Sequence, residues 1–393
     1  MNRKGRKTGE ERGLLRVCIV YDHIYPTTIG GGERWLHAVA IRLAAQGHRV
    51  TYLTLRHWSS EPPELPGVEV LGLAAAGRIY DAEQRRLGPP LRFGLAVARH
   101  LARWGGRYDV VHTAAFPYFG LLAAAALRRR HRYRLVVDWF ELWSRRYWRQ
   151  YAGVVAGTAG WSIQTLCVRL EQVPLAISEH TARQLRASGI RRLVTVLPGL
   201  YDGTQEPTPS EHPEQLVVFA GRHVREKRVP ELVRGFAFAR QRYPGLRLEL
   251  YGDGPDRPRV VETVRELGLQ DSVALLGRRS EAEVRRAFAR AACLATASAR
   301  EGYGLVVVEA AAHGTPSVVV RGEENAATEL VTEGANGTIA DSVAPEEVGE
   351  AIRRVVEGGA LLRATTVEWF RRNADTLTVE RSIEVVLDAY RSS

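Results

Sequence analysis

The sequence predicts an α/β protein built from two doubly wound domains, each a parallel sheet covered by helices on both faces. Short apolar runs alternate with helical patterns along the chain, as expected when crossover helices join parallel strands. The length of 393 residues exceeds one ordinary core, and four prolines interrupt the alternation at 197–215. We therefore expect one domain at 15–200, a linker at 201–214 and a second domain at 215–375.

The elements of the first half follow from apolar patterns and turn residues. A strand at 16–22 leads into a glycine-rich loop and a helix whose apolar residues recur at helical spacing until Gly47. An uncharged segment at 151–168 carries three glycines and several polar residues, which favours a packed helix over a membrane span. The remaining strands are expected at 48–55, 68–73, 108–112, 134–138, 174–178 and 193–197.

The second half repeats the alternation. A strand at 216–222 precedes a helix at 230–244, and later strands are expected at 246–255, 272–277, 292–298 and 316–320. Because ligand loops follow the carboxyl ends of parallel strands, the two domains would present their loops to a shared cleft. The last segment, 376–393, has an amphipathic pattern, and we expect a helix that packs back on the N-terminal domain.

Composition and charge narrow the function classes. Residues 1–14 are polar and basic, typical of a disordered tail, and no early apolar stretch resembles a signal peptide. The three cysteines show neither metal-binding spacing nor a disulfide framework, which is typical of a reducing cytoplasm. Residues 1–200 carry 30 basic and 14 acidic side chains, a net charge of +16, whereas residues 201–393 carry 25 and 30, a net charge of −5. Any surface for a polyanion therefore belongs to the first half.

Two cations follow the first strand of the second domain. Arg222 and Lys227 lie on the loop between that strand and the next helix, where cations can neutralise phosphate oxygens. Lys227 is also the only lysine beyond the N-terminal tail, in a chain that otherwise uses arginine. This isolation indicates a need for a compact charge, although two ordinary surface cations would give the same pattern.

A glycine loop and two glutamates have the positions of ligand-binding groups. Gly30, Gly31 and Gly32 come between the first strand and the first helix, where backbone N–H groups can approach an anion. Glu301 precedes a glycine-rich turn, and Glu309 lies about two turns into the apolar helix that follows. Sugar or ribose hydroxyls would suit such carboxylates, but a tight turn, an internal cap or a buried salt bridge would explain them as well.

Several stretches of the sequence resemble the motifs of one enzyme family. The stretch "EGYGLVVVEAAAHGTP" resembles the E-x7-E signature of glycosyltransferase family 4, whose members are retaining enzymes with the GT-B fold of two Rossmann-like domains. The runs "GGGERWLHAVAIRLAAQGHRVTYLT", "FAGRHVREKR" and "LYGDGP" are similar to further motifs of that family, in the same order. The resemblance covers most of the chain, and it is most specific in the second half.

The resemblance implies a role for each matching residue. Arg222 and Lys227 would bind the nucleoside diphosphate and stabilise its charge as it leaves, and Glu301 would face the donor sugar. Glu309 would accept hydrogen bonds from the ribose. Further donor contacts would come from backbone and loops, namely Gly30, Gly31, Gly32, Gly277, Arg278, Gly302, Tyr303, Gly304 and Leu305. Such enzymes need no divalent metal or other cofactor, and no convincing D-x-D loop is present.

The acceptor half departs from the family pattern. Family members often carry a histidine after the fifth strand, but Phe140 occupies that place in "VVDWFELW". This puts a histidine contact to acceptor or sugar in doubt. Asp138, Glu141 and the earlier His112 remain as polar candidates, and each would equally suit hydrogen bonding at a strand end.

Arginines and aromatic residues alternate at 143–151. Together with the basic segments at 90–104 and 127–134, they would suit an anionic bilayer, whereas a plain solvated surface is the competing explanation. No nucleic-acid recognition motif accompanies them.

The sequence therefore predicts a cytoplasmic retaining glycosyltransferase, either free or peripheral at the inner face of the membrane. It would move a sugar from a nucleotide donor to a hydroxyl acceptor, with a lipid-linked or cell-envelope glycan as one acceptor class. A phosphorylase, a nucleotide-sugar epimerase and a non-catalytic binding protein remain as alternatives. A pyridoxal-phosphate phosphorylase is disfavoured because Lys227 is the only lysine outside the tail.

Overall fold

The computed structural model describes residues 13–391, except for 79, 82–83, 208 and 210–212, and it divides the chain into two compact units. Unit 1 contains the described residues up to Ile177, then Thr181–Leu197, and the described residues from Ser382 onward. Unit 2 contains Ser178–His180 and Pro198–Arg381. The predicted tail at 1–14 lies almost wholly outside the described residues.

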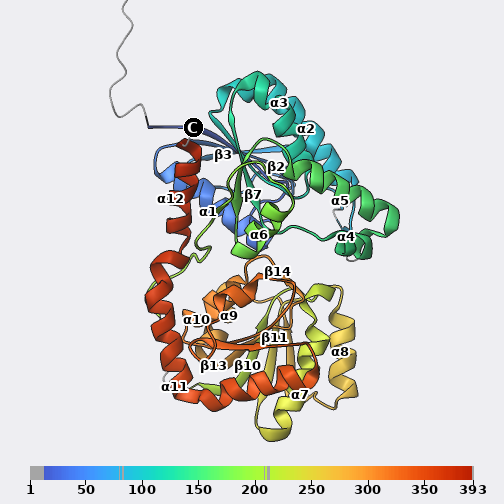
Figure 1. Ribbon diagram of the computed structural model, residues 1–393, viewed down its shortest axis with the longest axis vertical. Helices are drawn as coiled ribbons and strands as arrows, with labels where there is room; N and C mark the ends of the chain where they lie inside the picture. Colours follow the sequence, from blue (N-terminus) through green and yellow to red (C-terminus); the bar gives the residue numbers. More distant parts are fainter. Residues whose placement is uncertain (1–12, 79, 82–83, 208, 210–212, 392–393) are drawn as a thin grey trace, which may run out of the picture. The chain divides into compact units, whose positions relative to one another are not determined.

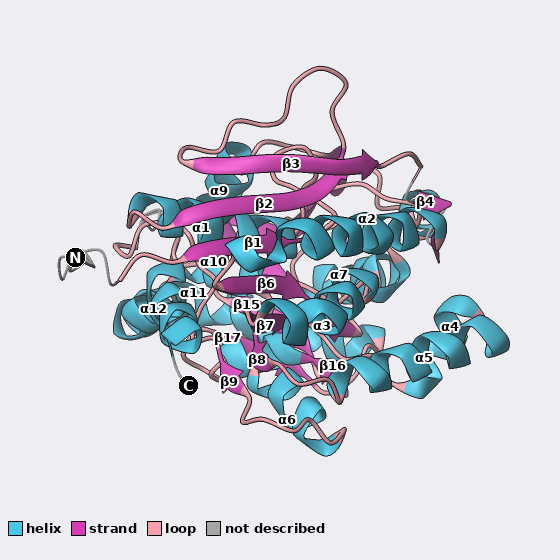
Figure 2. Cartoon of the chain, turned by 90° about the horizontal axis from the view of Figure 1, so that it is seen from above, coloured by secondary structure: helices cyan, strands magenta, loops and turns pink. Residues whose placement is uncertain are grey.

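Unit 1 is a seven-stranded parallel sheet with the order β3-β2-β1-β6-β7-β8-β9, which can be followed in Figure 2. Its strands are β1 (Arg16–Val20), β2 (Arg49–Arg56), β3 (Val68–Ala75), β6 (Val110–Ala114), β7 (Arg134–Trp139), β8 (Val173–Ala176) and β9 (Thr195–Val196). Its helices are α1 (Gly31–Ala45), α2 (Gly88–Trp104), α3 (Phe119–His131), α4 (Arg145–Ala152) and α5 (Val154–Val168), with α6 (Glu179–Ala187) shared between the units. A short 3-10 helix, η2 (Gly105–Arg107), and a two-stranded antiparallel pair, β4 (Tyr80–Asp81) and β5 (Gln84–Arg85), complete it.

Unit 2 is a six-stranded parallel sheet with the order β12-β11-β10-β13-β15-β17, enclosed by helices in Figure 1. Its strands are β10 (Glu214–Ala220), β11 (Arg247–Tyr251), β12 (Val273–Gly277), β13 (Ala291–Ala295), β15 (Ser317–Val320) and β17 (Gly337–Ala340), with a separate small pair of β14 (Arg300–Glu301) and β16 (Glu324–Asn325). Its helices are α7 (Val229–Arg242), α8 (Arg257–Glu266), α9 (Glu281–Arg290), α10 (Leu305–Ala311) and α11 (Pro345–Leu377), with 3-10 helices η3 (Arg225–Lys227) and η4 (Ala326–Leu330). The final helix is α12 (Val379–Arg391).

The predicted fold class is confirmed, because both sheets are parallel and both reverse their strand order beside their first strand. In unit 1 the reversal lies between β1 and β6, and in unit 2 it lies between β10 and β13. The middle of β10 and all of β1 after its first residue are buried, since helices cover the two faces of each sheet. Ligands of such sheets bind where loops diverge from the carboxyl ends of the strands at the reversal. Each unit therefore has one preferred edge for a ligand.

The linker contacts the chain at the start of the last helix, and the rest of that helix belongs to unit 1. Within unit 2, Tyr201 of the linker donates its amide to the Leu377 carbonyl (2.9 Å) and accepts from the Val379 amide (2.9 Å). A Cβ on Gly199 would lie 1.9 Å from the Leu377 carbonyl carbon, so only glycine allows the linker to pass so close. From Ser382 onward the chain belongs to unit 1, where α12 packs on the first domain.

The uncharged segment at 151–168 is divided between two helices, because Gly153 takes a positive φ of +80° that separates the end of α4 from α5. The side chains of Val154 and Val155 are 60% and 85% exposed, so α5 is less buried than its composition predicts. No helix of the described residues is both long and apolar enough to cross a bilayer.

Candidate functional site

The loop after β10 carries the two predicted phosphate-binding cations. Arg222 is exposed directly after the strand, and Lys227 ends the short helix η3. The Lys227 amide donates to the Val224 carbonyl (2.9 Å), which fixes the turn. On the same loop, the Glu226 carbonyl accepts from the Ala299 amide (2.8 Å), which joins this loop to the one after β13.

The loop after β13 places Glu301 against Lys227. The ammonium of Lys227 and the carboxylate of Glu301 form an ion pair, and their side chains are only 23% and 13% exposed. Ser298 donates its hydroxyl to Glu301 Oε1 (2.8 Å) and is itself 2.8 Å from the Thr296 hydroxyl. The two residues that the sequence assigned to phosphate and sugar, 74 positions apart, therefore meet at the reversal point of the unit 2 sheet.

A second layer of hydrogen bonds holds this loop in place. The side chain of Asn325, which is buried, donates to the carbonyls of Ser298 (3.1 Å) and Val320 (2.8 Å) and accepts from the Ala327 amide (3.1 Å). The sequence analysis missed Ser298 and Asn325, since short polar residues in loops carry no distinctive spacing. Their geometry makes them positioning residues for Glu301.

The glycine-rich turn between Glu301 and α10 depends on one glycine. Gly304 has a φ of +98°, and a Cβ there would lie 2.5 Å from the Cβ of Ala327. No other residue fits this position, because both the backbone conformation and the space require glycine. Gly302 lies two residues before Gly304, and Leu305 begins α10; a backbone contact from either to a donor stays a prediction. The Tyr303 ring is buried, and this burial raises the pKa of its hydroxyl.

Glu309 lies half-buried on α10, between buried neighbours of the same helix. The pKa of Tyr201, in the linker, is raised to about 12, and burial is the main cause. The charge of Arg285 lowers this pKa, whereas the charge of Glu309 raises it. The carboxylate is therefore within electrostatic range of a second polar group in the same unit.

The turn after β11 packs on the loop after β10. The His223 amide donates to the Asp253 carbonyl (3.0 Å), and a Cβ on Gly252 would lie 1.9 Å from the Gly221 carbonyl oxygen. Gly252 also donates its amide to the carbonyl of Gly277 (2.8 Å), which ends β12 with a φ of +68° and precedes the exposed Arg278. These contacts explain why the "GDG" run is needed beside the phosphate loop.

This corner also contains buried polar atoms that the sequence analysis missed. His223 is fully buried, and neither ring nitrogen has a hydrogen-bond partner among the described residues. Burial first, and then the nearby Arg257, lower the pKa of His223, so its ring is uncharged near neutral pH. The Nη1 atom of Arg257 is likewise buried without a partner in the described part of the chain. Because buried polar atoms normally have partners, these atoms are candidates for contacts to a bound ligand.

In unit 1 the glycine loop begins α1 at the carboxyl edge of the sheet. Gly30 is extended, with a φ of −166°, and α1 starts at Gly31. A Cβ on Gly32 would lie 2.8 Å from Phe140 and 3.0 Å from the Tyr21 hydroxyl. The glycine therefore makes room for Phe140, the residue that replaces the expected histidine.

His112 and Asp138, predicted as acceptor-side candidates, are fully buried in unit 1. The Nε2 atom of His112 lies 2.9 Å from Asp138 Oδ1, while Trp35 of α1 donates to Asp138 Oδ2 (2.7 Å). The Nδ1 atom of His112 lies 2.7 Å from the Tyr390 hydroxyl of α12. These four side chains form a buried network that joins α1, two strands and α12, so neither candidate exposes a surface to an acceptor. Glu141, in contrast, is partly exposed after β7.

Two histidines that the sequence analysis overlooked follow β1 and β2 at the same edge. The Nδ1 atom of His23 lies 2.9 Å from the buried carboxylate of Asp22, and Nε2 of His57 lies 2.7 Å from the Asp22 carbonyl oxygen. The two rings are 5.2 Å apart. Burial is the main cause that lowers the pKa of His57. Their positions, directly after two neighbouring strands, are the signal that would have identified them.

The aromatic and basic segment at 143–151 divides into two faces. Trp143 and Trp148 are buried and pack with ring centroids 4.6 Å apart, which corrects the expectation that these tryptophans meet a membrane. Arg145, Arg146 and Arg149 are exposed on α4. Among the described residues, no group of three or more histidine, cysteine or acidic side chains is arranged to hold a metal ion.

Two family models match consecutive parts of this chain. The model described as Glycosyltransferase Family 4 matches residues 29–202, and the model described as Glycosyl transferases group 1 matches residues 203–369. The boundary between them falls within the linker. Together they cover the reversal point of unit 2 and every predicted donor residue.

Among curated proteins, the chain is 35% identical over 152 residues to an exopolysaccharide phosphotransferase of Streptomyces coelicolor, covering 38% of this chain and 16% of that protein. It is 31% identical over 185 residues to a D-inositol 3-phosphate glycosyltransferase of Salinispora arenicola, covering 44% of this chain and 40% of that protein. The chain thus spans less than half the length of either relative.

Among solved structures, a sucrose-phosphate synthase of Thermosynechococcus elongatus superposes with a TM-score of 0.82 at 19% identity, covering 96% of this chain and 98% of that one. HepE of Anabaena, solved in complex with UDP and glucose, superposes with a TM-score of 0.74 at 18% identity, covering 96% and 100%. At these identities the likeness establishes the fold.

Proposed function

Because this chain belongs to glycosyltransferase family 4 and is a GT-B glycosyltransferase, we propose that it transfers a sugar from a nucleoside diphosphate to a hydroxyl acceptor with retention of anomeric configuration. The donor would bind at the reversal point of the unit 2 sheet. The observation that carries this proposal is the contact between Lys227 and Glu301 on the loops after β10 and β13.

The site suits a reaction in which the leaving group carries most of the developing charge. The bond between the anomeric carbon and the diphosphate oxygen breaks, the acceptor oxygen bonds to that carbon, and the acceptor proton passes to the departing phosphate. Lys227 and the exposed Arg222 would stabilise the phosphate charge in the transition state. Glu301 holds the Lys227 ammonium before the donor arrives and would face the sugar afterwards.

The remaining polar groups of unit 2 suit the rest of the nucleotide. Glu309, half-buried on α10, would accept hydrogen bonds from the ribose hydroxyls. The base would bind near the loop at Gly277 and Arg278. This loop contacts the turn after β11, which in turn contacts His223, whose ring nitrogens have no hydrogen-bond partner among the described residues. A uridine nucleotide is our first choice of donor, because HepE was solved with UDP. No metal or other cofactor is required by this scheme.

The test is a transfer assay with radiolabelled UDP-glucose and other nucleotide sugars, using acceptor mixtures from cell envelopes. Lys227→Ala and Arg222→Ala should each lower turnover roughly 10²-fold, as expected when a preorganised charge is removed from a leaving group. Arg225→Ala is the matched control, since Arg225 is exposed on the same loop, and it should retain activity.

Proton NMR of the product's anomeric centre tests retention separately. Near-wild-type turnover in Lys227→Ala would remove the phosphate assignment, and an inverted anomeric centre would remove the retaining mechanism. Donor binding without hydrolysis or transfer to any acceptor would favour a non-catalytic binding protein.

We also propose that unit 1 associates with an anionic membrane surface, which would suit a lipid-linked acceptor. The exposed arginines of α4 and the exposed Val154, Val155 and Leu166 of α5 support this. Basic residues near such a surface contribute about 1 kcal/mol each, and salt screens them over about 10 Å at 0.1 M. Replacing Arg145, Arg146 and Arg149 with glutamate should therefore release the protein from anionic vesicles.

The control for this test applies the same charge change to unit 2, with Arg242, Arg265 and Arg371 replaced by glutamate; all three are exposed. Sedimentation with anionic and neutral vesicles, at low and high salt, measures the difference. Wild-type protein that stays in the supernatant with anionic vesicles would end the membrane proposal and leave a soluble acceptor.

A further inference from the structure

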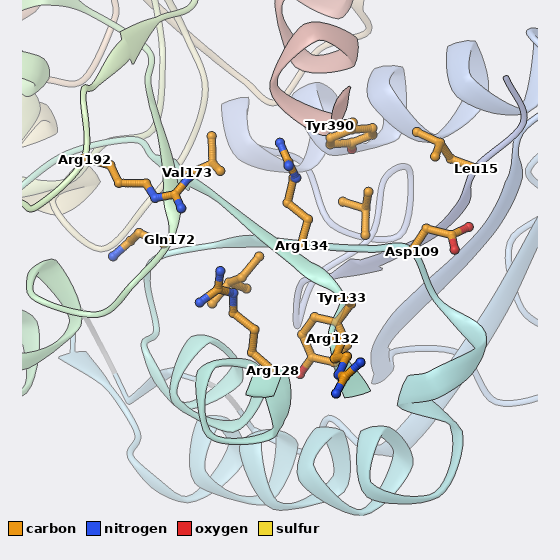
Figure 3. A pocket seen from close by; sticks show the side chains of 12 residues that line it. Leu15, Asp109, Arg128, Arg132, Tyr133, Arg134, Gln172, Val173, Arg192 and Tyr390 are labelled. Carbon is orange, nitrogen blue, oxygen red and sulfur yellow. The ribbon is translucent and has the colours of Figure 1, made fainter. Parts of the chain in front are cut away.

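An arginine-lined cavity lies in unit 1 at the edge opposite the ligand loops. Its volume is about 320 Å³, and it is bounded by the amino-terminal ends of β6, β7 and β8 together with the end of α3 and Tyr390 of α12. Figure 3 shows Arg128, Arg132, Arg134 and Arg192 arranged around one hollow, although they come from different elements. The six residues of β7, at about 3.3 Å each, separate this cavity from the carboxyl edge of the sheet.

The floor of the cavity is fixed by buried polar side chains. Gln172 accepts a hydrogen bond from the Trp139 indole (2.9 Å), and the Tyr133 hydroxyl donates to the Ala124 carbonyl (2.5 Å). The Tyr390 hydroxyl is held by His112. The cavity is therefore a preformed feature of the fold rather than a gap between mobile side chains.

The charges around the cavity do not balance. Glu171 pairs with both Arg128 (2.9 Å) and Arg192 (3.6 Å), so one carboxylate serves two arginines. Asp109, the acidic residue of the lining, is bound by Arg16 outside the cavity (2.6 Å), which lowers the pKa of its carboxyl. The other two arginines of the lining, Arg132 and Arg134, have no carboxylate partner among the described residues.

A helix terminus alone does not explain this cluster. Basic residues at the end of α3 would complement the carbonyls of that helix, which accounts for Arg128 and Arg132. Arg134 begins β7 and Arg192 lies on the loop before β9, so neither belongs to α3. Burial, followed by Arg192 and Arg128, lowers the pKa of Arg134, while its Nη1 atom donates to the Ala389 carbonyl (3.0 Å). The cluster therefore holds four arginines together, and Glu171 is the one carboxylate that pairs with any of them in the described part of the chain.

We propose that this cavity binds the phosphate group of a small phosphorylated ligand, at a site distinct from the nucleotide site of unit 2. Guanidinium groups recognise phosphate through paired hydrogen bonds, and four of them surround this space. The volume of about 320 Å³ lies at the lower end of small-molecule pockets, which begin near 300 Å³. A phosphorylated sugar or a short diphosphate is therefore the appropriate size, and an anionic lipid headgroup carries the same chemistry.

The test uses the full chain carrying both Arg222→Ala and Lys227→Ala, so that the two cations proposed to bind diphosphate at the donor site are removed. Calorimetric titration with inorganic pyrophosphate should reveal the unit 1 site in this background. Adding Arg132→Gln and Arg134→Gln should weaken it at least about tenfold, as expected for the loss of charged hydrogen bonds. The control adds Arg92→Gln and Arg99→Gln, two exposed arginines of α2, with the same change in charge.

A second arm uses phosphatidylcholine vesicles with and without phosphatidic acid. Arginine-dependent binding of pyrophosphate identifies a soluble ligand, whereas arginine-dependent binding only to phosphatidic acid identifies a lipid headgroup. Should the double variant unfold, Arg132→Glu alone suffices, because Arg132 is exposed at the helix end and its reversal should repel phosphate. Equal binding by pocket and control variants, or binding to neither probe, overturns the proposal.

Discussion

Removing the hydroxyl of Tyr390 should destabilise unit 1, because that hydroxyl holds the buried ring of His112. The two atoms lie 2.7 Å apart, His112 is fully buried and Tyr390 is 4% exposed. Tyr390→Phe keeps the ring and its packing but leaves Nδ1 of His112 without its partner. An unsatisfied buried polar group costs about 1–3 kcal/mol. For a unit of about 200 residues, each kcal/mol corresponds to about 2–4 °C in Tm.

The matched control is Tyr243→Phe. The Tyr243 hydroxyl also makes a hydrogen bond of 2.7 Å, to Glu357 Oε1, but on the surface of unit 2. Because water replaces an exposed partner, this substitution should change stability far less. Urea unfolding followed by tryptophan fluorescence compares the two variants with the wild type. Equal losses in both variants, or no loss in Tyr390→Phe, would show that the network does not stabilise the unit as argued.

Two further outcomes are expected. Glu309→Gln should weaken nucleoside diphosphate binding in calorimetry, whereas Glu301→Gln should leave binding largely intact and reduce turnover; unchanged binding in Glu309→Gln would remove the ribose role. His223 has a folded-state pKa below its ordinary value of 6.5 because of burial, so on acidification the unfolded chain takes a proton that the folded chain resists. The free energy of unfolding should therefore decrease as the pH is lowered from 7.5 to 5.5. His223→Gln should reduce the slope of this free energy against pH by an amount that corresponds to at most one bound proton, and an unchanged slope would contradict this.

The sequence predicts the fold because both halves repeat one pattern, apolar strands separated by helices, and that pattern decides a doubly wound sheet. It also predicts that Lys227 and Glu301 belong to one site, since each follows a strand and ligand loops diverge from such ends. The structure brings the two side chains into contact. Chain order and strand ends are sufficient for these inferences, because neither depends on which way a side chain points.

The sequence is not sufficient to predict which way individual side chains point. β6 and β7 are buried on both faces, so their residues show no alternation that would reveal His112 and Asp138 as internal. The eight residues of α4 are too few to show which aromatic residues face inward, and so Trp148 was expected at the surface. The arginine cavity is equally hidden, because Arg134 and Arg192 meet only through the arrangement of strands and loops.

The return of α12 to unit 1 has a consequence for the order of events during synthesis. The first unit is discontinuous, and the 184 residues of Pro198–Arg381 separate its main part from its last segment, which begins at Ser382. At about 5–20 residues per second, a ribosome needs about 10–40 s to make that stretch. Throughout this interval His112 and Arg134 lack their partners from α12. All strands of the second unit have been translated by the end of this interval, so the second unit is free to fold first. The first unit, which leaves the ribosome earlier, would then complete its fold last.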